Sequence, residues 1–270
     1  SIKASYAKMQ QSVHLLSSSG VGLPTDLWLP ATKKVRPSTS VQYALGIAQS
    51  IEHGLYEFSI ETFYKKMNNL IEYRAGADIF SSTSDWQNAV EKNGIGLSYG
   101  AEFLLQKKQG NNTGWIGYTL SKTTRQFENL NKGKPFNYRY DRRHDISVVY
   151  LRKINENIDF SATWVFGTGN AFTLAIARYN VLSENGIYEN IHVYEGINTF
   201  RMRPYHKMDI GFNFRKQKKR GIRTWNVSIY NLYNRQNPYY YYFENNLDNV
   251  VLKQVSLFPI MPSASYSFNF

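Results

Sequence analysis

Residues 95–108, with the sequence IGLSYGAEFLLQKK, decide the fold class of this chain. Apolar or bulky side chains alternate there with small or polar ones along most of the segment, the exception being Leu104. Strict alternation predicts a β-strand with one apolar and one polar face. The same period of two recurs in residues 41–48, 56–65, 158–166, 208–214 and 264–270.

The strands predicted around these runs are about ten residues long or longer, which matches a tilted membrane-crossing strand and exceeds the usual strand of a soluble protein. The alternation predicts an all-β fold, a transmembrane antiparallel up-and-down barrel wall of about ten strands. We expect the strands near residues 1–10, 40–51, 55–66, 95–108, 114–124, 143–152, 157–167, 205–215, 222–243 and 250–270.

The connections between the first nine predicted strands alternate in length. Residues 52–54, 109–113, 153–156 and 216–221 form short turns, whereas 11–39, 67–94, 125–142 and 168–204 form long loops. Outer-membrane barrels have short periplasmic turns and longer extracellular loops. The asymmetry therefore predicts that the odd-numbered strands run outward.

Composition excludes several other classes. No apolar run approaches the 18 or so residues of a spanning helix, and the absence of cysteine removes disulfides and thiolate sites. The net charge of +12 is scattered, and its densest cluster, residues 215–220, is expected to be a solvated turn rather than a nucleic-acid site. The first residues do not read as a signal peptide, so we expect a mature chain or a fragment.

A soluble β-sandwich or lipocalin-like barrel is the alternative, because its strands also alternate. Such a fold does not explain connections of 18 to 37 residues that alternate regularly with short turns, since long structureless loops are uncommon in compact domains. The loop lengths therefore favour the membrane barrel.

From residue 37 onward the sequence resembles the C-terminal half of the barrel of a TonB-dependent receptor of the Bacteroidetes type. The resemblance lies in residues 40–46, 61–73, 96–102, 113–121, 139–145, 159–164, 226–234 and 256–270. The final alternating segment, which ends in Phe270, resembles the signal that the barrel assembly machinery reads.

The resemblance implies a receptor integral to the outer membrane of a Gram-negative bacterium. Receptors of this kind have 22-stranded barrels with a plug inside. Neither a plug nor a TonB-contacting segment is recognisable here, so residues 1–270 are expected to be the C-terminal part of the barrel. The implied partners are TonB, acting through the plug, outer-membrane lipids and, by analogy with glycan importers, a surface lipoprotein lid.

The richest charged cluster is expected at the extracellular rim. It comprises Arg139, Asp141, Arg142, Arg143 and Asp145, with His144 among them. Guanidinium groups suit carboxylates, phosphates and sugar hydroxyls, so these five residues are the candidate ligand-binding set. The alternative is a salt-bridge network that fixes the loop.

Catalysis is not expected. His144 and Asp145 suggest an omptin-like protease, but adjacent strand residues point to opposite faces and cannot share one site by themselves. No hydrolase motif, metal-ligand spacing or cofactor motif is present. We therefore expect no enzyme activity, no metal and no cofactor.

Two further groups of residues are assigned to the interior and to the membrane boundary of the predicted barrel. A polar set of mixed charge is predicted to face inward: Glu57, Glu61, Lys65, Glu102, Gln106, Asp159, Asn213 and Asn226. The run 239–243, facing 257–258, is predicted to be an interfacial aromatic girdle, or else a stacking platform for a sugar.

The sequence thus predicts an outer-membrane receptor for active uptake of a scarce nutrient, with the substrate open among glycan, peptide, siderophore and cobalamin. The rival interpretation is a self-contained ten-stranded barrel that acts as a protease, adhesin or porin.

Overall fold

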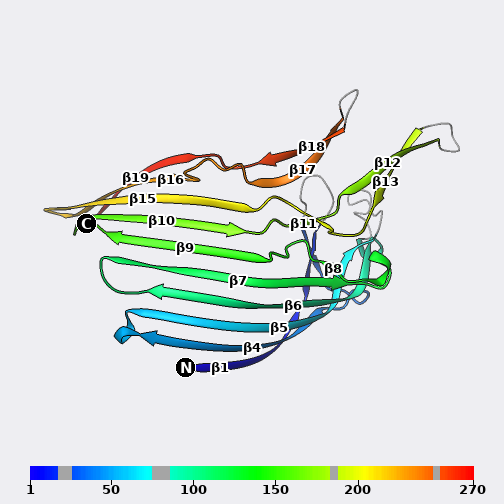
Figure 1. Ribbon diagram of the computed structural model, residues 1–270, viewed down its shortest axis with the longest axis horizontal. Coiled ribbons are helices and arrows are strands. Elements are labelled where there is room, and N and C mark those ends of the chain that lie inside the picture. The colour runs from blue at the N-terminus through cyan, green and yellow to red at the C-terminus, as the bar shows by residue number, and fades with distance from the viewer. Residues whose placement is uncertain (18–25, 75–85, 183–187, 246–249) are drawn as a thin grey trace.

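The computed structural model describes residues 1–17, 26–74, 86–182, 188–245 and 250–270. Its framework is one antiparallel sheet, in which the order β1-β4-β5-β6-β7-β9-β10-β15-β16-β19 follows the chain (Figure 1). The strands of this path are β1 (Ile2–Gln11), β4 (Ser38–Ile51), β5 (Tyr56–Tyr73), β6 (Val90–Lys107), β7 (Asn112–Gln126), β9 (His144–Lys153), β10 (Ile158–Gly167), β15 (Tyr205–Lys218), β16 (Gly221–Tyr230) and β19 (Met261–Asn269). The predicted all-β class and up-and-down order are confirmed, and the sheet is an open wall, not a closed barrel.

The register keeps the alternation in step from strand to strand. Ile47 of β4 pairs with Ile60 of β5, Ile60 with Phe103 of β6, and Phe103 with Tyr118 of β7. We call the surface that carries these residues the apolar face and the opposite surface the polar face. The side chains predicted to face inward all lie on the polar face, where Glu61 pairs with Glu102 and Asp159 with Asn213.

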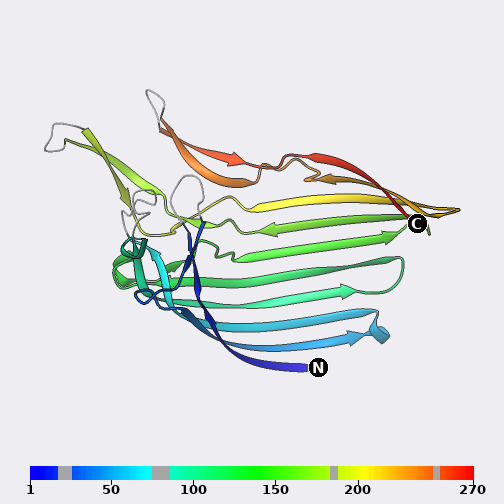
Figure 2. The ribbon, with the colours of Figure 1, turned by 180° about the vertical axis from the view of Figure 1, so that it is seen from behind.

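The connections at the two ends of the wall differ in length, as predicted from the sequence. Residues 52–55, 108–111, 154–157 and 219–220 connect strands at what we call the short-turn end, where η1 (Glu52–Gly54) lies. Long segments connect them at the long-loop end (Figures 1 and 2). The elements of those segments are the pairs β2 (Val13–Ser17) with β3 (Asp26–Pro30), β11 (Ala171–Phe172) with β14 (Phe200–Arg201), β12 (Ala175–Leu182) with β13 (Tyr188–Tyr194) and β17 (Pro238–Asn245) with β18 (Val250–Ser256), together with β8 (Phe136–Asn137), η2 (Trp86–Asn88) and η3 (Asn131–Gly133).

The prediction of one strand over 222–243 was wrong. β16 ends at Tyr230, because Asn231 adopts φ 52° and its buried amide donates to the carbonyls of Arg235 (2.9 Å) and Phe258 (3.1 Å). This turn sends the chain into the separate hairpin β17–β18. The predicted strand 250–270 is likewise divided between β18 and β19.

The aromatic run 239–243 therefore lies on a hairpin beyond the wall and not in a wall strand. Within the hairpin, Tyr240 pairs with Val255 and Phe243 with Leu252, so residues 257–258 are not its strand partners. Tyr241 stacks on Phe172, with ring centroids 5.4 Å apart. A sugar-stacking role for this run stays a prediction.

Strands β5 and β6 extend further than the alternation indicated. Register shifts between Met67, Leu70 and Glu72 interrupt the period of two, yet pairing continues to Tyr73 and Val90. The predicted loop 67–94 is thus shortened to residues 74–89. The extension carries Ile71 and Glu72 above the regular wall.

The buried apolar clusters of the described residues lie at the long-loop end. Leu16, Val35, Ile71 and Val90 form one cluster, and Leu70, Phe127, Leu130 and Phe136 form another. Both join residues of the long connections to the extended strand ends. Burial of apolar surface therefore fixes the loops rather than the wall.

The wall itself leaves its apolar side chains uncovered. The accessible surface is 17578 Å², whereas a folded soluble monomer of this mass exposes roughly 12,000 Å². Exposed large side chains such as Tyr43, Ile47, Tyr64 and Trp225 contribute to the excess. In the described part of the chain, no helix is long and apolar enough to cross a membrane.

The two faces can be tested with neighbouring residues of one strand. Ile60→Arg places a charge on the apolar face, and Ser59→Arg places the same charge on the polar face of β5. We expect Ile60→Arg to lower the free energy of unfolding in a bilayer by about 2–4 kcal/mol, as for arginine at the lipid-facing midplane of a barrel, and Ser59→Arg to have little effect. Urea titration in lipid vesicles measures both; equal losses would contradict the assignment of faces.

Candidate ligand-binding site

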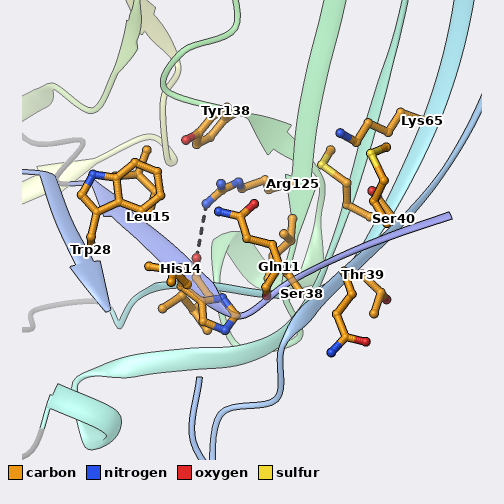
Figure 3. A pocket seen from close by; sticks show the side chains of 16 residues that line it. Gln11, His14, Leu15, Trp28, Ser38, Thr39, Ser40, Lys65, Arg125 and Tyr138 are labelled. Atoms are coloured by element: carbon orange, nitrogen blue, oxygen red, sulfur yellow. Dashed lines mark hydrogen bonds between the residues drawn. The ribbon is translucent and has the colours of Figure 1, made fainter. Parts of the chain in front are cut away.

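A cavity of about 570 Å³ lies at the long-loop end of the polar face. One side is formed by wall residues of β1, β4 and β5, among them Met9, Ser40 and Lys65. The other side is formed by the hairpin β2–β3, with His14 and Trp28, and by residues of β7 and the segment after it. Figure 3 shows Arg125 near the centre, between Tyr138 and Gln11, with Trp28 and Lys65 on opposite sides.

The sequence of the first long connection explains how the hairpin closes over the wall. The strand β1 stops pairing with β4 at Gln11, and β2 then pairs with β3 from Val13 to Ser17. His14 and Leu16 are buried, whereas Val13 and Leu15 are more exposed, and Leu16 enters the cluster with Ile71 and Val90. Burial of Leu16 thus holds β2 against the extension of β5.

Arg125 is fixed by three contacts. Its Nη1 donates to the carbonyl of Ile71 (3.2 Å) and to the Glu72 carboxylate (3.0 Å), and its guanidinium lies 3.8 Å from the centre of the Tyr138 ring. Glu72 is buried, and burial raises its pKa even though Arg125 acts in the opposite direction. The arginine therefore presents a rigid, partly neutralised cation beside the cavity.

Other lining groups are free to meet a ligand. Among the residues that the structure describes, Lys65 has no ion-pair or hydrogen-bond partner. The Trp28 residue is 62% exposed, and Ser38 and Thr39 add hydroxyl groups nearby. A cation, an aromatic face and hydroxyls together suit a ligand with both anionic and apolar parts.

A hydrogen bond fastens the hairpin to the segment that follows β8. Tyr140 donates its hydroxyl to the Asp26 carboxylate over 2.5 Å. Burial, and then this bond, raise the pKa of Tyr140 to about 12. The roof of the cavity is thus linked to residues next to the predicted rim cluster.

Two residues of that cluster, Arg139 and Asp141, are buried. Asp141 is 1% exposed, accepts the Thr123 backbone N–H over 2.6 Å and forms an ion pair with Arg201. Arg201 also donates to the Asp141 carbonyl over 2.6 Å. This geometry is that of a network fixing the loop, which was the alternative raised from the sequence.

The remaining members separate across the wall. Arg142 and Asp145 form a largely exposed pair at 3.4 Å, and Arg143 is exposed beside them. His144 lies on the apolar face, where its Nδ1 is 2.9 Å from the Tyr118 hydroxyl. The prediction that His144 and Asp145 cannot share one site is confirmed, whereas ligand contact by the five residues stays a prediction.

A second hollow of the polar face, about 380 Å³, is lined by Glu61, Glu102 and Asp145. These carboxylates lie in one register row, since Glu61 pairs with Glu102, Glu102 with Thr119, and Thr119 with Asp145. The row makes this part of the polar face acidic. No three His, Asp or Glu residues converge as a metal site within the described ranges.

Comparison with known proteins supplies the family. The model of the family described as "TonB dependent receptor-like, beta-barrel" matches residues 1–234. The chain belongs to the TonB-dependent receptor family. A search of the curated proteins gave no match. Members of this family are outer-membrane receptors of Gram-negative bacteria and transporters rather than enzymes.

Solved receptors share the fold of this TonB-dependent receptor chain at low identity. The ferric-catecholate import receptor Fiu of E. coli K12 superposes with a TM-score of 0.57, is 12% identical, and aligns over 98% of this chain and 33% of its own. The ferripyoverdine receptor of Pseudomonas aeruginosa superposes with a TM-score of 0.55, is 13% identical, and aligns over 98% of this chain and 30% of its own. The siderophore receptor PirA of Acinetobacter baumannii superposes with a TM-score of 0.53, is 16% identical, and aligns over 87% of this chain and 35% of its own. The present chain thus spans about a third of each receptor.

The loop-fixing role of Asp141 predicts a large effect from its removal. Asp141→Ala leaves the Arg201 guanidinium and the Thr123 N–H without their acceptor, and we expect a loss of about 3–5 kcal/mol in the free energy of unfolding. Arg142→Ala removes an exposed pair and is the control, with an expected change within about 1 kcal/mol. Denaturant titration of both variants checks the difference, and similar losses would refute the buried network.

His14 predicts a pH dependence of the cavity roof. The side chain is buried with Nε2 3.0 Å from the Arg36 carbonyl, and burial lowers its pKa. A lowered folded-state pKa stabilises the hairpin above about pH 6.5 and loses this contribution as the pH falls further. Hydrogen exchange in residues 13–17, corrected for intrinsic rates, should accelerate on acidification, and His14→Gln should remove the change. An unchanged pH response in the variant would exclude His14 as the cause.

Proposed function

We propose that this chain forms part of the barrel wall and the extracellular entrance of an outer-membrane receptor that takes up a scarce nutrient with energy relayed by TonB. The cavity beneath the hairpin β2–β3 is the observation that carries the proposal. It opens on the polar face at the long-loop end, and barrels of this kind turn that face to the lumen and the long loops to the outside.

The lining suggests the chemistry of the nutrient. Lys65 and Arg125 favour an anionic group, and Trp28 and Tyr138 favour an aromatic or sugar-ring face. Arg142, Arg143 and Asp145 are proposed as secondary contacts at the rim. The open candidates are still glycan, peptide, siderophore and cobalamin.

The wider architecture is part of the same proposal. Residues 1–270 would be the C-terminal part of a 22-stranded barrel, with a plug contributed by other residues and Phe270 read by the assembly machinery. A surface lipoprotein lid of the Bacteroidetes kind is supported by the hairpin β12–β13, which exposes Tyr179, Val181 and Ile191 on one side. Apolar patches of this sort commonly contact a protein partner. The intact mass of the polypeptide extracted from its native membrane tests the larger barrel.

Uptake measurements test the function. The full receptor, produced with its own TonB system in cells lacking other receptors, should accumulate one labelled nutrient class only when the membrane is energised. We expect Lys65→Ala to weaken binding of that nutrient about tenfold, because a charged contact contributes roughly 1.5 kcal/mol or more. Trp28→Ala should weaken it by a similar or smaller factor.

Lys3→Ala is the matched control, since Lys3 lies on the polar face of β1 near the short-turn end, away from the cavity. Its affinity should equal that of the unmodified receptor. Accumulation without energy would indicate a diffusion porin instead. Full affinity in both cavity variants would remove the cavity from the proposal.

A further inference from the structure

The basic cluster noted in the sequence lies at the tip of the hairpin that β15 and β16 form. Residues 216–223, which we call the basic hairpin, contain five lysines or arginines and no acidic residue. Segments of the same length around the other short turns, 50–57, 106–113 and 152–159, contain at most two lysines or arginines each. Among the short turns, positive charge is therefore concentrated at this one.

The basic hairpin extends beyond its neighbour on one side. β10 pairs with β15 only as far as Phe214, and the last contact is the Arg215 N–H donating to the Asn157 carbonyl over 2.7 Å. Beyond that contact β15 pairs with β16 alone, up to the final pair of Lys218 with Gly221. Four residues past Phe214 correspond to about 13 Å along the strand. Figures 1 and 2 show the end of β15 reaching farther than the other turns at this end.

The apolar face ends next to the basic hairpin in an aromatic row. Phe214 pairs with Trp225 and Trp225 with Tyr266, and the rings of Trp225 and Tyr266 are centred 5.0 Å apart. Tryptophan and tyrosine gather at the boundary between membrane and water. Headgroups extend roughly 5–8 Å beyond the hydrocarbon core, whereas Lys218 lies about 10 Å past the aromatic row once the strand tilt is counted. The end of the hairpin therefore reaches past the lipid headgroups into water.

The described part of the chain offers these charges no counter-ion. Arg215, just before the basic hairpin, pairs with Asp159 over 2.5 Å. None of the five cations of the hairpin forms an ion pair within the described ranges, and the buried Nε of Arg223 has no hydrogen-bond partner. Glu156 of the neighbouring turn is exposed and pairs with none of them. The five cations are thus open to a negatively charged partner from outside the chain.

The cations are spread around the hairpin. Three lie on the side that continues the apolar face, and two lie in the turn itself: Lys216, Lys218, Arg223, Lys219 and Arg220. The hairpin has one apolar side chain, Ile222. Tight protein interfaces centre on clusters of aromatic or apolar anchors, and a single isoleucine is no such cluster. Cations on several sides of a turn suit a flexible polymer that carries many carboxylates, to which lysine and arginine donate charge-assisted hydrogen bonds.

We propose that the basic hairpin binds the peptidoglycan layer through the free carboxylates of its stem peptides. The inference rests on the orientation in the proposed function, with the short turns in the periplasm, and not on the transported nutrient. Stem peptides recur along the polymer, so several carboxylates engage one hairpin together, and weak single contacts add up to stable attachment. Such attachment would hold the receptor at the cell wall while force acts on its plug.

Co-sedimentation of the full receptor with purified, protein-free sacculi tests the proposal, with the receptor held in nanodiscs of neutral lipid. The quadruple variant Lys216→Gln, Lys218→Gln, Lys219→Gln, Arg220→Gln should bind on the order of tenfold more weakly, because each exposed contact is weak but four act together. Sacculi whose carboxylates have been converted to amides should bind the unmodified receptor as weakly. Salt at about 0.5 M should release it from untreated sacculi.

The matched control is the quadruple variant Lys107→Gln, Lys108→Gln, Arg152→Gln, Lys153→Gln, which removes the same charge from the same end of the wall. It should bind sacculi like the unmodified receptor, and the heat-dependent gel mobility of both variants verifies that the barrel is folded. Equal losses in the two variants, or full binding to amidated sacculi, would overturn the proposal. A hairpin variant that keeps its binding to sacculi and loses only binding to phosphatidylglycerol vesicles would overturn it in favour of a lipid contact.

Trypsin cleavage separates this inference from the proposed function. In the proposed orientation, trypsin should cut the basic hairpin only after the outer membrane has been permeabilised. Cleavage in intact cells would overturn the orientation and the inference together. Cleavage after permeabilisation alone, combined with full sacculus binding by the hairpin variant, would overturn the inference and leave the proposed function standing.

Discussion

The structure depends on one continuous ladder of backbone hydrogen bonds. From β1 to β19, each wall strand pairs antiparallel with the next along the path, and the register stays in step except for the shifts at the long-loop end of β5 and β6. In a bilayer every backbone N–H and C=O must be satisfied within the protein, and such a ladder satisfies them without a helix. Because paired residues share a face, the ladder also carries the two-residue period of each strand across the whole sheet, and this produces one apolar and one polar surface.

This division explains where apolar burial occurs. The wall has no core of its own, since the rest of the described chain leaves the side chains of its apolar face exposed. The buried clusters around Leu16 and Phe127 instead bind the long connections to the extended ends of β5 and β6. Polar contacts also fix how these connections are oriented. Examples are the ion pair of Asp141 with Arg201 and the hydrogen bond of Tyr140 with Asp26. The long-loop end is therefore the part of the molecule that packs like a soluble protein, and the cavity forms there.

The periodicity predicted the wall well because membrane strands are long and each position is constrained by its face. Eight of the ten strands could be located in this way before any pairing was known. The failure at 222–243 has a physical cause: the amide of Asn231 closes a turn through Arg235 and Phe258, and Phe258 is distant in the sequence. An alternating aromatic run after such a turn looks the same whether it lies in the wall or in a hairpin. Only the tertiary hydrogen bonds distinguish the two.

The candidate site was harder to predict because sequence proximity misleads at the end of a strand. Arg139 to Asp145 form one cluster in the sequence, but folding buries Asp141 in the loop and sends His144 and Asp145 to opposite faces. The cavity is assembled instead mainly from β1, β2, β3, β4, β5 and β7, and its residues Trp28, Lys65 and Arg125 are far apart in the chain. One local signal was present, since Glu72 within the apolar run 70–73 requires a buried cation, and Arg125 is that cation. An acidic residue within an apolar run therefore predicts a basic partner on another strand, and the cavity lies where those strands meet.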